Sequence, residues 1–528
     1  MMPHLPILPI VLPLCAAALM LLSGESRRRA RAALALLATL AQLAAALALL
    51  AVAGDGSVRV YALGGWAAPF GIVLVADRLA AIMLALTATL GLAALVYSLA
   101  RWERAGSHYL PLFQILLMGL NGAFLTGDLF NLFVFFEVLL AASYGLALHG
   151  SGAARVTAGM HYIAVNLVAS LFFLIAAALI YGIAGTLNMA ELAQRVAALD
   201  AADRALFELG AALLGIVFLV KAGAWPLNFW LPAAYGAAAA PVAGIFALLT
   251  KVGVYALLRF AVLLEEAGAP APFRGDWLFY CGLATIATGS LGALAAQKLD
   301  RLASALVIVS SGTLLAAFGF TGTTLTGPAL YYLASSVLAI GAFFLVIEMA
   351  ERSRAAAADL LAISAEAFGL EDRPDSDYPD EAAGIPIPAA MAFLGLAFLA
   401  CALLLAGLPP LSSFVGKFAL LSAAIAAAPQ ASSLHAGLFV AALLLSGLMG
   451  LVALSRLGIR VFWDAGPGTP RLLWTEAGPV AALLLLCAAL TLGAGPALRY
   501  FDAAARSLHD ARAYIGAVLP AQAAGGAP

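Results

Sequence analysis

Charged side chains are scarce in this sequence. Only 10% of its 528 residues are Asp, Glu, Lys or Arg, whereas soluble domains carry about 25%. Mean hydropathy is +1.03, and 64% of the residues are hydrophobic. This composition excludes a cytosolic globular enzyme and indicates a polytopic membrane protein with the lipid bilayer around it. The net charge of -1 gives no reason to expect nucleic acid or another strongly charged partner.

Lysine and cysteine are rarer still. There are four lysines, at positions 221, 251, 298 and 417, against 23 arginines. The four cysteines lie inside apolar runs, with no CxxC spacing and no neighbouring histidine, so we expect small core residues rather than a disulfide or a metal site. The chain also lacks a GxxxxGKS/T phosphate loop. We expect no metal and no cofactor.

Apolar segments long enough to cross a membrane recur from Leu5 to Leu498. A membrane helix needs about 20 mostly apolar residues, and the sequence predicts fourteen such segments, two of them with an internal break. Their predicted ranges are 5–22, 32–53, 77–100, 109–126, 129–148, 159–182, 206–238 (broken), 241–263, 276–296, 302–320, 328–350, 388–427 (broken), 436–461 and 477–498.

The basic residues predict an orientation. Arg27, Arg28, Arg29 and Arg31 follow the first apolar run instead of preceding it, which indicates a retained helix with its amino end outside rather than a signal peptide. Alternating from there places fifteen basic residues inside, nine outside and three within the membrane. Both termini are then expected outside.

Three stretches fall outside the predicted segments. Residues 183–204 contain MAELAQRVAAL, which is typical of an amphipathic helix on the outer surface. Residues 351–386 carry nine acids against three arginines and predict a solvated loop, with a partner contact as the alternative. The last 29 residues are alanine-rich with scattered charge and predict at most another surface helix.

Four charged side chains fall within the predicted membrane segments, away from their ends. Placing an ionisable group there costs at least about 2.5 kcal/mol, so each is a functional candidate, with a structural ion pair as the alternative. Glu137 lies at least eight residues from either end of its helix. Lys251 lies about ten residues from both ends, too far to reach the interface. Tyr255 and Arg259 follow it at four-residue steps, which predicts one polar stripe facing protein or water.

The other two candidates, Lys221 and Lys417, occur in the broken segments. Proline removes a backbone donor and breaks the helix ladder, and irregular backbone at membrane depth is tolerated only where it lines an enclosed or water-filled cavity. Paired broken segments point to a transporter site, and two unrelated kinks with interfacial lysines are the alternative. The prolines at the breaks are Pro226, Pro232, Pro409 and Pro410.

The remaining polar residues are weaker candidates. Asp77, Asp128 and Glu348 fall near segment ends, which favours ordinary interfacial positions. All six histidines also lie at or near segment ends, so we expect no histidine relay at mid-membrane. Lysine suits proton transfer because burial favours its neutral amine, whereas arginine stays protonated. A nearby carboxylate favours the charged ammonium, so moving or protonating Glu137 would make a lysine partner release its proton.

Four stretches carry a family resemblance: GGWAAPFGIVLVADRL, NGAFLTGDLFNLFVFFEVLLAASYGLALHG, VKAGAWPLNFWLPAAYGAAAAPVAGIFALLTKVGVY and GLPPLSSFVGKF. They resemble the proton-conducting membrane transporter superfamily, which includes the antiporter-like subunits of respiratory complex I and the large subunits of the Mrp-type (Pha or Mnh) multisubunit antiporter. FLTGDLFNLFVFFEVLL and GGWAAPFGI are most similar to the D subunits of the Mrp type. The resemblance covers nearly the whole chain.

The resemblance implies an all-α fold of about fourteen transmembrane helices, with two inverted five-helix repeats and broken seventh and twelfth helices. It divides the chain into an N-terminal part (1–108), a proton-conducting core (109–461, with repeats at about 109–263 and 276–461) and a C-terminal helix with a surface tail (462–528). The family's buried chain of groups carries over onto Glu137, Lys221, Lys251 and Lys417.

Two positions depart from the family pattern. Ser335 stands where members often carry a histidine in the eleventh helix, and Ala305 stands where a tyrosine is common. The link from Lys251 to Lys417 must therefore use water or hydroxyl groups. The candidate relay residues are Tyr255, Ser310, Ser311, Thr313, Tyr332 and Ser335.

The sequence leaves three candidate functions for this chain. The first is a subunit of a secondary antiporter that exchanges protons (in) for sodium or another monovalent cation (out), a transporter rather than an enzyme. The resemblance implies other antiporter subunits as partners and the plasma (inner) membrane of a bacterium. The second is a proton-pumping membrane subunit of a redox complex, either a complex I-like NADH:quinone oxidoreductase or a membrane hydrogenase. The third, an inert scaffold, is disfavoured by the insertion cost of four buried charges.

Overall fold

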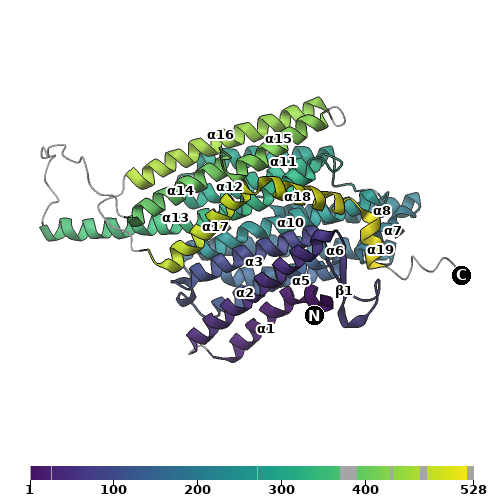
Figure 1. The fold of residues 1–528 in the computed structure, drawn as a ribbon, viewed down its shortest axis with the longest axis horizontal. Helices are drawn as coiled ribbons and strands as arrows, with labels where there is room; N and C mark the ends of the chain where they lie inside the picture. The colour runs from purple at the N-terminus through teal and green to yellow at the C-terminus, as the bar shows by residue number, and fades with distance from the viewer. Residues whose placement is uncertain are drawn as a thin grey trace.

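The computed structural model describes residues 2–24, 27–269, 271–368, 389–428, 432–463 and 472–519. This part of the chain is almost entirely helical, and most of its helices run along the long axis of the molecule (Figure 1). Thirteen of the described helices are long and apolar enough to cross a membrane. Together with the shorter apolar helix α4 they make the fourteen crossings expected from the sequence, so that prediction is confirmed.

The first ten helices cover the N-terminal half. They are α1 (Leu8–Leu22), α2 (Arg28–Val52), α3 (Arg78–Ser98), α4 (Tyr109–Leu125), α5 (Leu129–Ala147), α6 (Ala153–Ala184), α7 (Met189–Ala197), α8 (Ala201–Ala222), α9 (Leu231–Ala237) and α10 (Ala240–Glu266). The described strands, β1 (Arg59–Ala62) and β2 (Val73–Ala76), form an antiparallel hairpin between α2 and α3, with Arg59 opposite Ala76.

Nine more helices follow. They are α11 (Asp276–Ala295), α12 (Leu299–Gly319), α13 (Thr326–Phe368), α14 (Ala389–Ala406), α15 (Ser412–Ala427), α16 (Ser433–Trp463), α17 (Trp474–Leu492), α18 (Ala494–Leu508) and α19 (Ala511–Val518). The seventh and twelfth crossings are the broken ones, α8 with α9 and α14 with α15, as expected. The N-terminal turn η1 (Met2–Ile7) and α19 both contact β1, so the two chain ends lie at the same end of the bundle.

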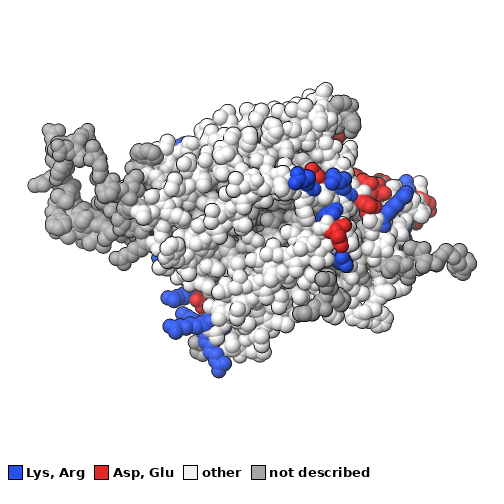
Figure 2. Space-filling view, in the orientation of Figure 1, with Lys and Arg blue, Asp and Glu red and all other residues white. Residues whose placement is uncertain are grey.

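The core is built on α10, α12 and α13. Every residue of α10 from Ala240 to Leu264 is buried, and the membrane-length stretches of α12 and α13 are buried as well. Figure 1 shows these helices between α1–α3 on one side and α14–α16 on the other. The outer helices expose leucine and other apolar side chains, and Figure 2 shows charged side chains gathered toward the ends of the visible face. The uncharged band between them is the surface that a bilayer covers.

Small residues let α4 and α5 approach closely. A Cβ atom added to Gly119 would lie 2.6 Å from the Leu139 Cβ and 2.8 Å from the Leu139 backbone nitrogen. A Cβ atom on Gly122 would lie 2.2 Å from the ring of Phe135. Close backbone approach through glycine is a common way for membrane helices to gain contact area. It fixes α5, the helix that carries Glu137, against its neighbour.

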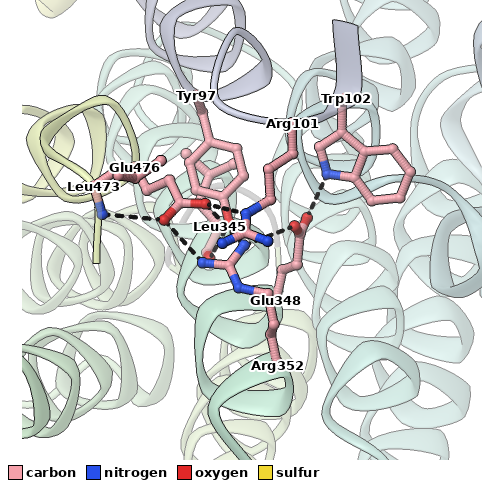
Figure 3. A network of polar contacts seen from close by, with 8 residues as sticks. All are labelled: Tyr97, Arg101, Trp102, Leu345, Glu348, Arg352, Leu473 and Glu476. Carbon is pink, nitrogen blue, oxygen red and sulfur yellow. Dashed lines mark hydrogen bonds and ion pairs between the residues drawn. The ribbon is translucent and has the colours of Figure 1, made fainter. Parts of the chain in front are cut away.

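An ion-pair cluster ties three helices together where α3 ends (Figure 3). Glu476, at the start of α17, accepts hydrogen bonds from Arg101 (3.1 Å) and from Arg352 of α13 (2.8 Å). Glu348, one turn before Arg352, accepts a hydrogen bond of 2.8 Å from the indole nitrogen of Trp102. Glu476 is fully buried, and the two arginines balance the charges of Glu476 and Glu348.

Several expectations need correction. Residues 351–368 continue α13 instead of forming a loop, because this alanine-rich stretch favours helix; residues 369–388, with the acidic EDRPDSDYPDE run, lie outside the described residues. The segment expected at 477–498 is two helices, with α17 ending at Leu492 and α18 starting at Ala494. The last 29 residues carry the end of α18 and α19, both with a buried face; residues 520–528 lie outside the described residues.

Two smaller expectations also change. The amphipathic helix α7 exists, but its buried residues Met189, Leu192 and Val196 face protein, since α7 contacts α10 and α19. The four cysteines are free, as expected, yet only Cys401 and Cys487 are buried. Cys15 is exposed on α1, so it is not a core residue.

The close packing of α4 against α5 can be tested by adding one methyl group. Gly119→Ala should destabilise the protein by about 1 to 3 kcal/mol, because the nearest atoms are the Cβ and the backbone of Leu139 on α5, which cannot rotate away. Gly395→Ala in α14 is the control, since no atom lies within 4 Å of the added Cβ and alanine favours helix. Thermal unfolding of the purified chain in detergent measures both, and equal unfolding temperatures for the two variants would contradict this packing.

Candidate functional site

Glu137 and Lys221 form the first part of a row of buried polar groups. Glu137, half-buried on α5, accepts a hydrogen bond from Ser170 of α6. One turn earlier on α6, Asn166 accepts a hydrogen bond of 3.1 Å from the Lys221 ammonium of α8. Among the described residues no ion pair joins Glu137 to Lys221, although the carboxylate is near enough to act on the ammonium electrostatically. The two charges are neighbours separated by neutral side chains of one helix.

The break after Lys221 is held by hydroxyl groups of α11. α8 ends at Ala222, and Gly223 has a φ of +68°, a conformation that favours glycine. The backbone N–H of Trp225 donates to Thr285 (2.9 Å), and the side chain of Asn228 donates to Thr288 (3.4 Å). These hydroxyls satisfy backbone and side-chain groups that a continuous helix would not expose, as membrane depth requires. Pro226 lies in this break and Pro232 is in the first turn of α9.

Lys251 lies at the centre of the molecule. Its exposed fraction is 0%, and its ammonium donates to Ser311 of α12 (3.0 Å) and to Thr250 (3.3 Å). Helices α8 and α10 meet closely here, since a Cβ on Gly253 would lie 2.9 Å from the Cβ of Lys221. Lys221 and Lys251 are therefore carried by two helices in direct contact, and both have only neutral hydrogen-bond partners.

A chain of serine hydroxyls continues from Lys251 toward Lys417. Ser310, next to Ser311 on α12, lies 3.0 Å from the hydroxyl of Ser336 on α13. Ser335, next to Ser336, lies 2.7 Å from the hydroxyl of Ser412 and 2.8 Å from that of Ser413, both in the first turn of α15. The hydroxyls thus cross from α12 through α13 to α15, the helix that carries Lys417.

The other relay candidates are less directly placed. Thr313 donates to the carbonyl of Val309 in its own helix, at 2.9 Å. Tyr332, on α13, lies beside the hydroxyls of Thr313 and Ser310. Tyr255 donates to the Phe124 carbonyl of α4 at 2.6 Å, so its hydroxyl is directed away from α12. Tyr255 does not join the serine chain.

Lys417 closes the row at the second break. Its ammonium donates to the Ala406 carbonyl, at the end of α14, over 2.8 Å. Gly407 has a φ of +78°, and a Cβ there would lie 2.5 Å from the Lys417 Cδ, so only glycine leaves room for the lysine. Pro409 and Pro410 occupy the break between α14 and α15. A cavity of about 250 Å³, lined by residues of this break and of α16, lies beside the ammonium.

Asp77 is the clearest departure from the sequence prediction. It is 3% exposed instead of interfacial, and it both caps α3 and pairs with Arg259 of α10, with a distance of 2.7 Å between Oδ1 and Nη2. Arg259 also donates to Tyr255 (3.3 Å) and lies over the ring of Tyr514 from α19. The polar stripe of α10 faces protein, as predicted, and its outer end is an ion pair.

The start of α5 is fixed by a second, partly buried aspartate. Asp128 caps α5 by accepting a hydrogen bond of 2.8 Å from the backbone of Asn131. Burial raises the pKa of the Asp128 carboxyl above its ordinary value, and the hydrogen bonds from the α5 backbone oppose the rise. The loop before α7 pairs with it, since Asp128 and Asn188 form an isolated antiparallel bridge. This anchors the helix that carries Glu137 at its outer end.

Comparison with known proteins identifies the family. The sequence family described as "NADH:quinone oxidoreductase/Mrp antiporter, TM" matches residues 126–445. The chain belongs to this family. It is 54% identical to the D subunit of a probable K(+)/H(+) antiporter of Rhizobium meliloti (strain 1021), over 99% of this chain and 98% of that protein. It is 34% identical to the D subunit of the Na(+)/H(+) antiporter of Bacillus subtilis (strain 168), over 97% and 99% of the two chains.

Chains in solved structures of membrane complexes share the fold. A chain in the structure of the Mrp complex from Dietzia sp. DQ12-45-1b is 27% identical, with a TM-score of 0.81 over 98% of this chain and 99% of that one. A chain of an archaeal membrane-bound sulfane sulfur reductase, 23% identical, has a TM-score of 0.83. The expected likeness to the D subunits of the Mrp type is confirmed, and with it a transporter subunit rather than an enzyme.

Five polar residues beside the row were not predicted from the sequence. They are Asn166, Ser170, Ser336, Ser412 and Ser413. The spacing of these residues in the sequence could have indicated them. Asn166 and Ser170 share a face of α6, and Ser336 directly follows Ser335. The run LSSFVGK also places Ser412 and Ser413 one turn before Lys417.

Breaking the buried Asp77–Arg259 ion pair and, separately, an exposed ion pair compares how much each contributes to stability. Arg259→Met should destabilise the protein by about 3 to 5 kcal/mol, because it leaves a buried carboxylate without its partner. Arg59→Met, which breaks an Arg–Asp pair whose side chains are 47% and 51% exposed, should change the unfolding temperature little. Thermal unfolding of the purified chain reports both changes, and a similar effect of the two substitutions would show that the buried pair has no special role.

Proposed function

We propose that this chain is the proton-carrying subunit of a multisubunit antiporter that exchanges protons for a monovalent cation. Protons pass along Glu137, Lys221, Lys251 and Lys417 in the middle of the bundle. The relatives over the full length of the chain are named as D subunits of potassium/proton and sodium/proton antiporters, which supports exchange over the pumping role in a redox complex. Potassium and sodium are the two cations to test first.

The partners of the three lysines carry this proposal. Lys221 donates to an amide oxygen, Lys251 to two hydroxyls and Lys417 to a backbone carbonyl. A carboxylate in contact would hold the proton on each ammonium, whereas neutral acceptors leave burial free to favour the uncharged amine. Buried groups with neutral partners therefore change protonation state more readily than a paired arginine does.

Glu137 acts as the switch at the start of the row. Its negative charge favours the ammonium form of Lys221, although Asn166 and not the carboxylate makes the direct contact. When Glu137 takes up a proton, that stabilisation is lost and Lys221 releases its own proton toward Lys251. The lysines then discharge in turn along the row, with no cofactor in the pathway.

The serine chain takes the place of the histidine found in other family members. A hydroxyl both donates and accepts, so it can pass a proton to a neighbour when its O–H rotates. Ser311, Ser310, Ser336, Ser335 and Ser412 supply successive hydroxyls from α12 to α15. Adjacent serines of one helix, such as Ser310 and Ser311, direct their hydroxyls to different sides. A water molecule completes the proton transfer between them.

The membrane, the orientation and the neighbouring subunits are proposed from the same family. We place the chain in the bacterial plasma membrane with both termini outside, beside other antiporter subunits. The N-terminal part (1–108) and the C-terminal part (462–528) flank the conducting core (109–461). The match to residues 126–445 lies within that core and supports the division.

Glu137→Gln should remove the switch while keeping shape and polarity. Vesicles are prepared from cells that lack their own antiporters and express the complete complex, and dye quenching follows proton exchange on addition of sodium or potassium. We expect a loss of at least about tenfold in rate, equivalent to about 1.4 kcal/mol in the barrier. Glu208→Gln, in α8 and outside the row, is the control. Unchanged exchange by Glu137→Gln at equal protein level would contradict the proposal.

Ser335→Ala tests the serine chain. It removes a hydroxyl that contacts both Ser412 and Ser413, and the loss of two hydrogen bonds, together about 1 to 3 kcal/mol, predicts exchange that is roughly 5 to 150 times slower. Ser335→Thr keeps the hydroxyl and should retain most of the rate. Ser446→Ala is the matched control, because the Ser446 hydroxyl bonds only to the Leu443 carbonyl of its own helix. Equal rates for Ser335→Ala and Ser446→Ala would exclude protons from this route.

A further inference from the structure

A second group of charged residues lies away from the row, at the end of the bundle where α1 turns into α2. A pocket of about 260 Å³ opens there between the start of α2, the short turn η4 (Trp102–Arg104) and the start of α4. Its charged lining residues are Arg28, Arg31, Glu103 and Arg104. Figure 2 shows basic side chains gathered at this end of the molecule, with acidic atoms beside them.

Arg31 is the unusual member of this group. It is 8% exposed, its Nε atom is buried without a hydrogen-bond partner, and no described carboxylate pairs with it. A guanidinium does not lose its proton inside a protein, so burial leaves an uncompensated charge. Arg28 lies three residues earlier on the same face of α2, where like charges repel. The two neighbouring positive charges favour the binding of an anion between them.

The backbone adds to the positive potential. α2 and α4 both begin at the pocket, and neither has a side chain that caps its first N–H groups. Uncapped N–H groups and the positive end of the helix dipole attract anions. Three arginines against the single lining glutamate leave two net positive charges around the pocket. These features match a phosphate group, whose oxygens accept several hydrogen bonds from guanidinium groups at once.

We propose that this pocket binds the phosphate of an anionic membrane phospholipid. The pocket lies where membrane-spanning helices end, at the level of lipid headgroups. The neighbouring surfaces of α1 and α2 expose Leu22, Leu37 and Leu40, against which acyl chains pack. Basic pockets between the ends of transmembrane helices are the sites that take anionic headgroups. The lipid supplies the charge that Arg31 lacks and joins α2 to α4. The site is independent of the proton row and of its function.

Native mass spectrometry of the complete complex in detergent tests the site. The complex is titrated with phosphatidylglycerol, with phosphatidylcholine of the same acyl chains, and with glycerol 3-phosphate as the soluble phosphate. The expected result is retention of phosphatidylglycerol, with an apparent affinity at least fivefold lower in Arg31→Gln. Arg29→Gln is the matched control, because Arg29 is exposed on the same helical turn and does not line the pocket.

Because loss of a buried arginine can disturb folding, the exposed positions provide a second variant. Arg28→Gln combined with Arg104→Gln should lower phosphatidylglycerol affinity by at least the same factor in a complex that unfolds at the wild-type temperature. Equal loss in Arg29→Gln would show a diffuse surface effect and overturn the proposal. Equal binding of phosphatidylcholine would overturn it too. Displacement of the lipid by millimolar glycerol 3-phosphate would assign the pocket to soluble phosphate instead.

Discussion

An ionisable amine buried beside neutral partners is the feature on which the arrangement of this protein depends. Lys251 has no exposed surface and touches only hydroxyl groups, on a helix that is buried along nearly its whole length. Such a group is stable in that position only because it can exist without its proton. Helices α6, α12 and α14 each contribute the neutral oxygen that one lysine needs. The breaks and the glycine at position 407 make room for these contacts.

Buried and partly buried arginines follow the opposite rule. Arg259 is paired with Asp77, Arg352 with Glu476, and Arg274 with Glu265, so each fixed positive charge has a fixed negative partner. These pairs hold α10 to α3, α13 to α17, and the end of α10 to the loop before α11. These arginines thus have carboxylate partners, whereas the three lysines of the row, where we propose that charge changes, have neutral ones. Arg31, buried without a carboxylate among the described residues, departs from this rule.

Much of the fold and of the row could be predicted because each apolar run of the sequence can be interpreted without knowing how the rest of the chain packs. A carboxylate or ammonium in the middle of an apolar run is costly wherever the rest of the chain packs, so Glu137 and the three lysines stood out in the sequence. The prolines marked both breaks for the same reason. Ser310, Ser311 and Ser335 were found through their position between the lysines. Their partners Ser336 and Ser412 were not, because a serine becomes a relay candidate only when another helix brings a second hydroxyl to it.

Positions near segment ends were harder to predict. Distance from the centre of an apolar run says little about water access, and the Arg259 side chain with Tyr514 of α19 covers Asp77 almost completely. The charged stretch after Glu348 looked like a loop because charge normally marks the water phase. Its alanine content and i,i+4 pairing of Glu348 with Arg352 favour a continued helix.

The length of α13 has a mechanical consequence. Its 43 residues span about 65 Å, roughly twice the thickness of the hydrocarbon layer, as a single stiff rod. Ser335 and Ser336 belong to that rod, and so do Glu348 and Arg352 beyond them. A partner that moved the protruding end along the helix axis by one residue's rise, about 1.5 Å, would shift Ser335 relative to Ser412 by more than half of the 2.7 Å between their hydroxyls. The proposed proton path therefore runs through a helix whose end a partner outside the membrane can reach.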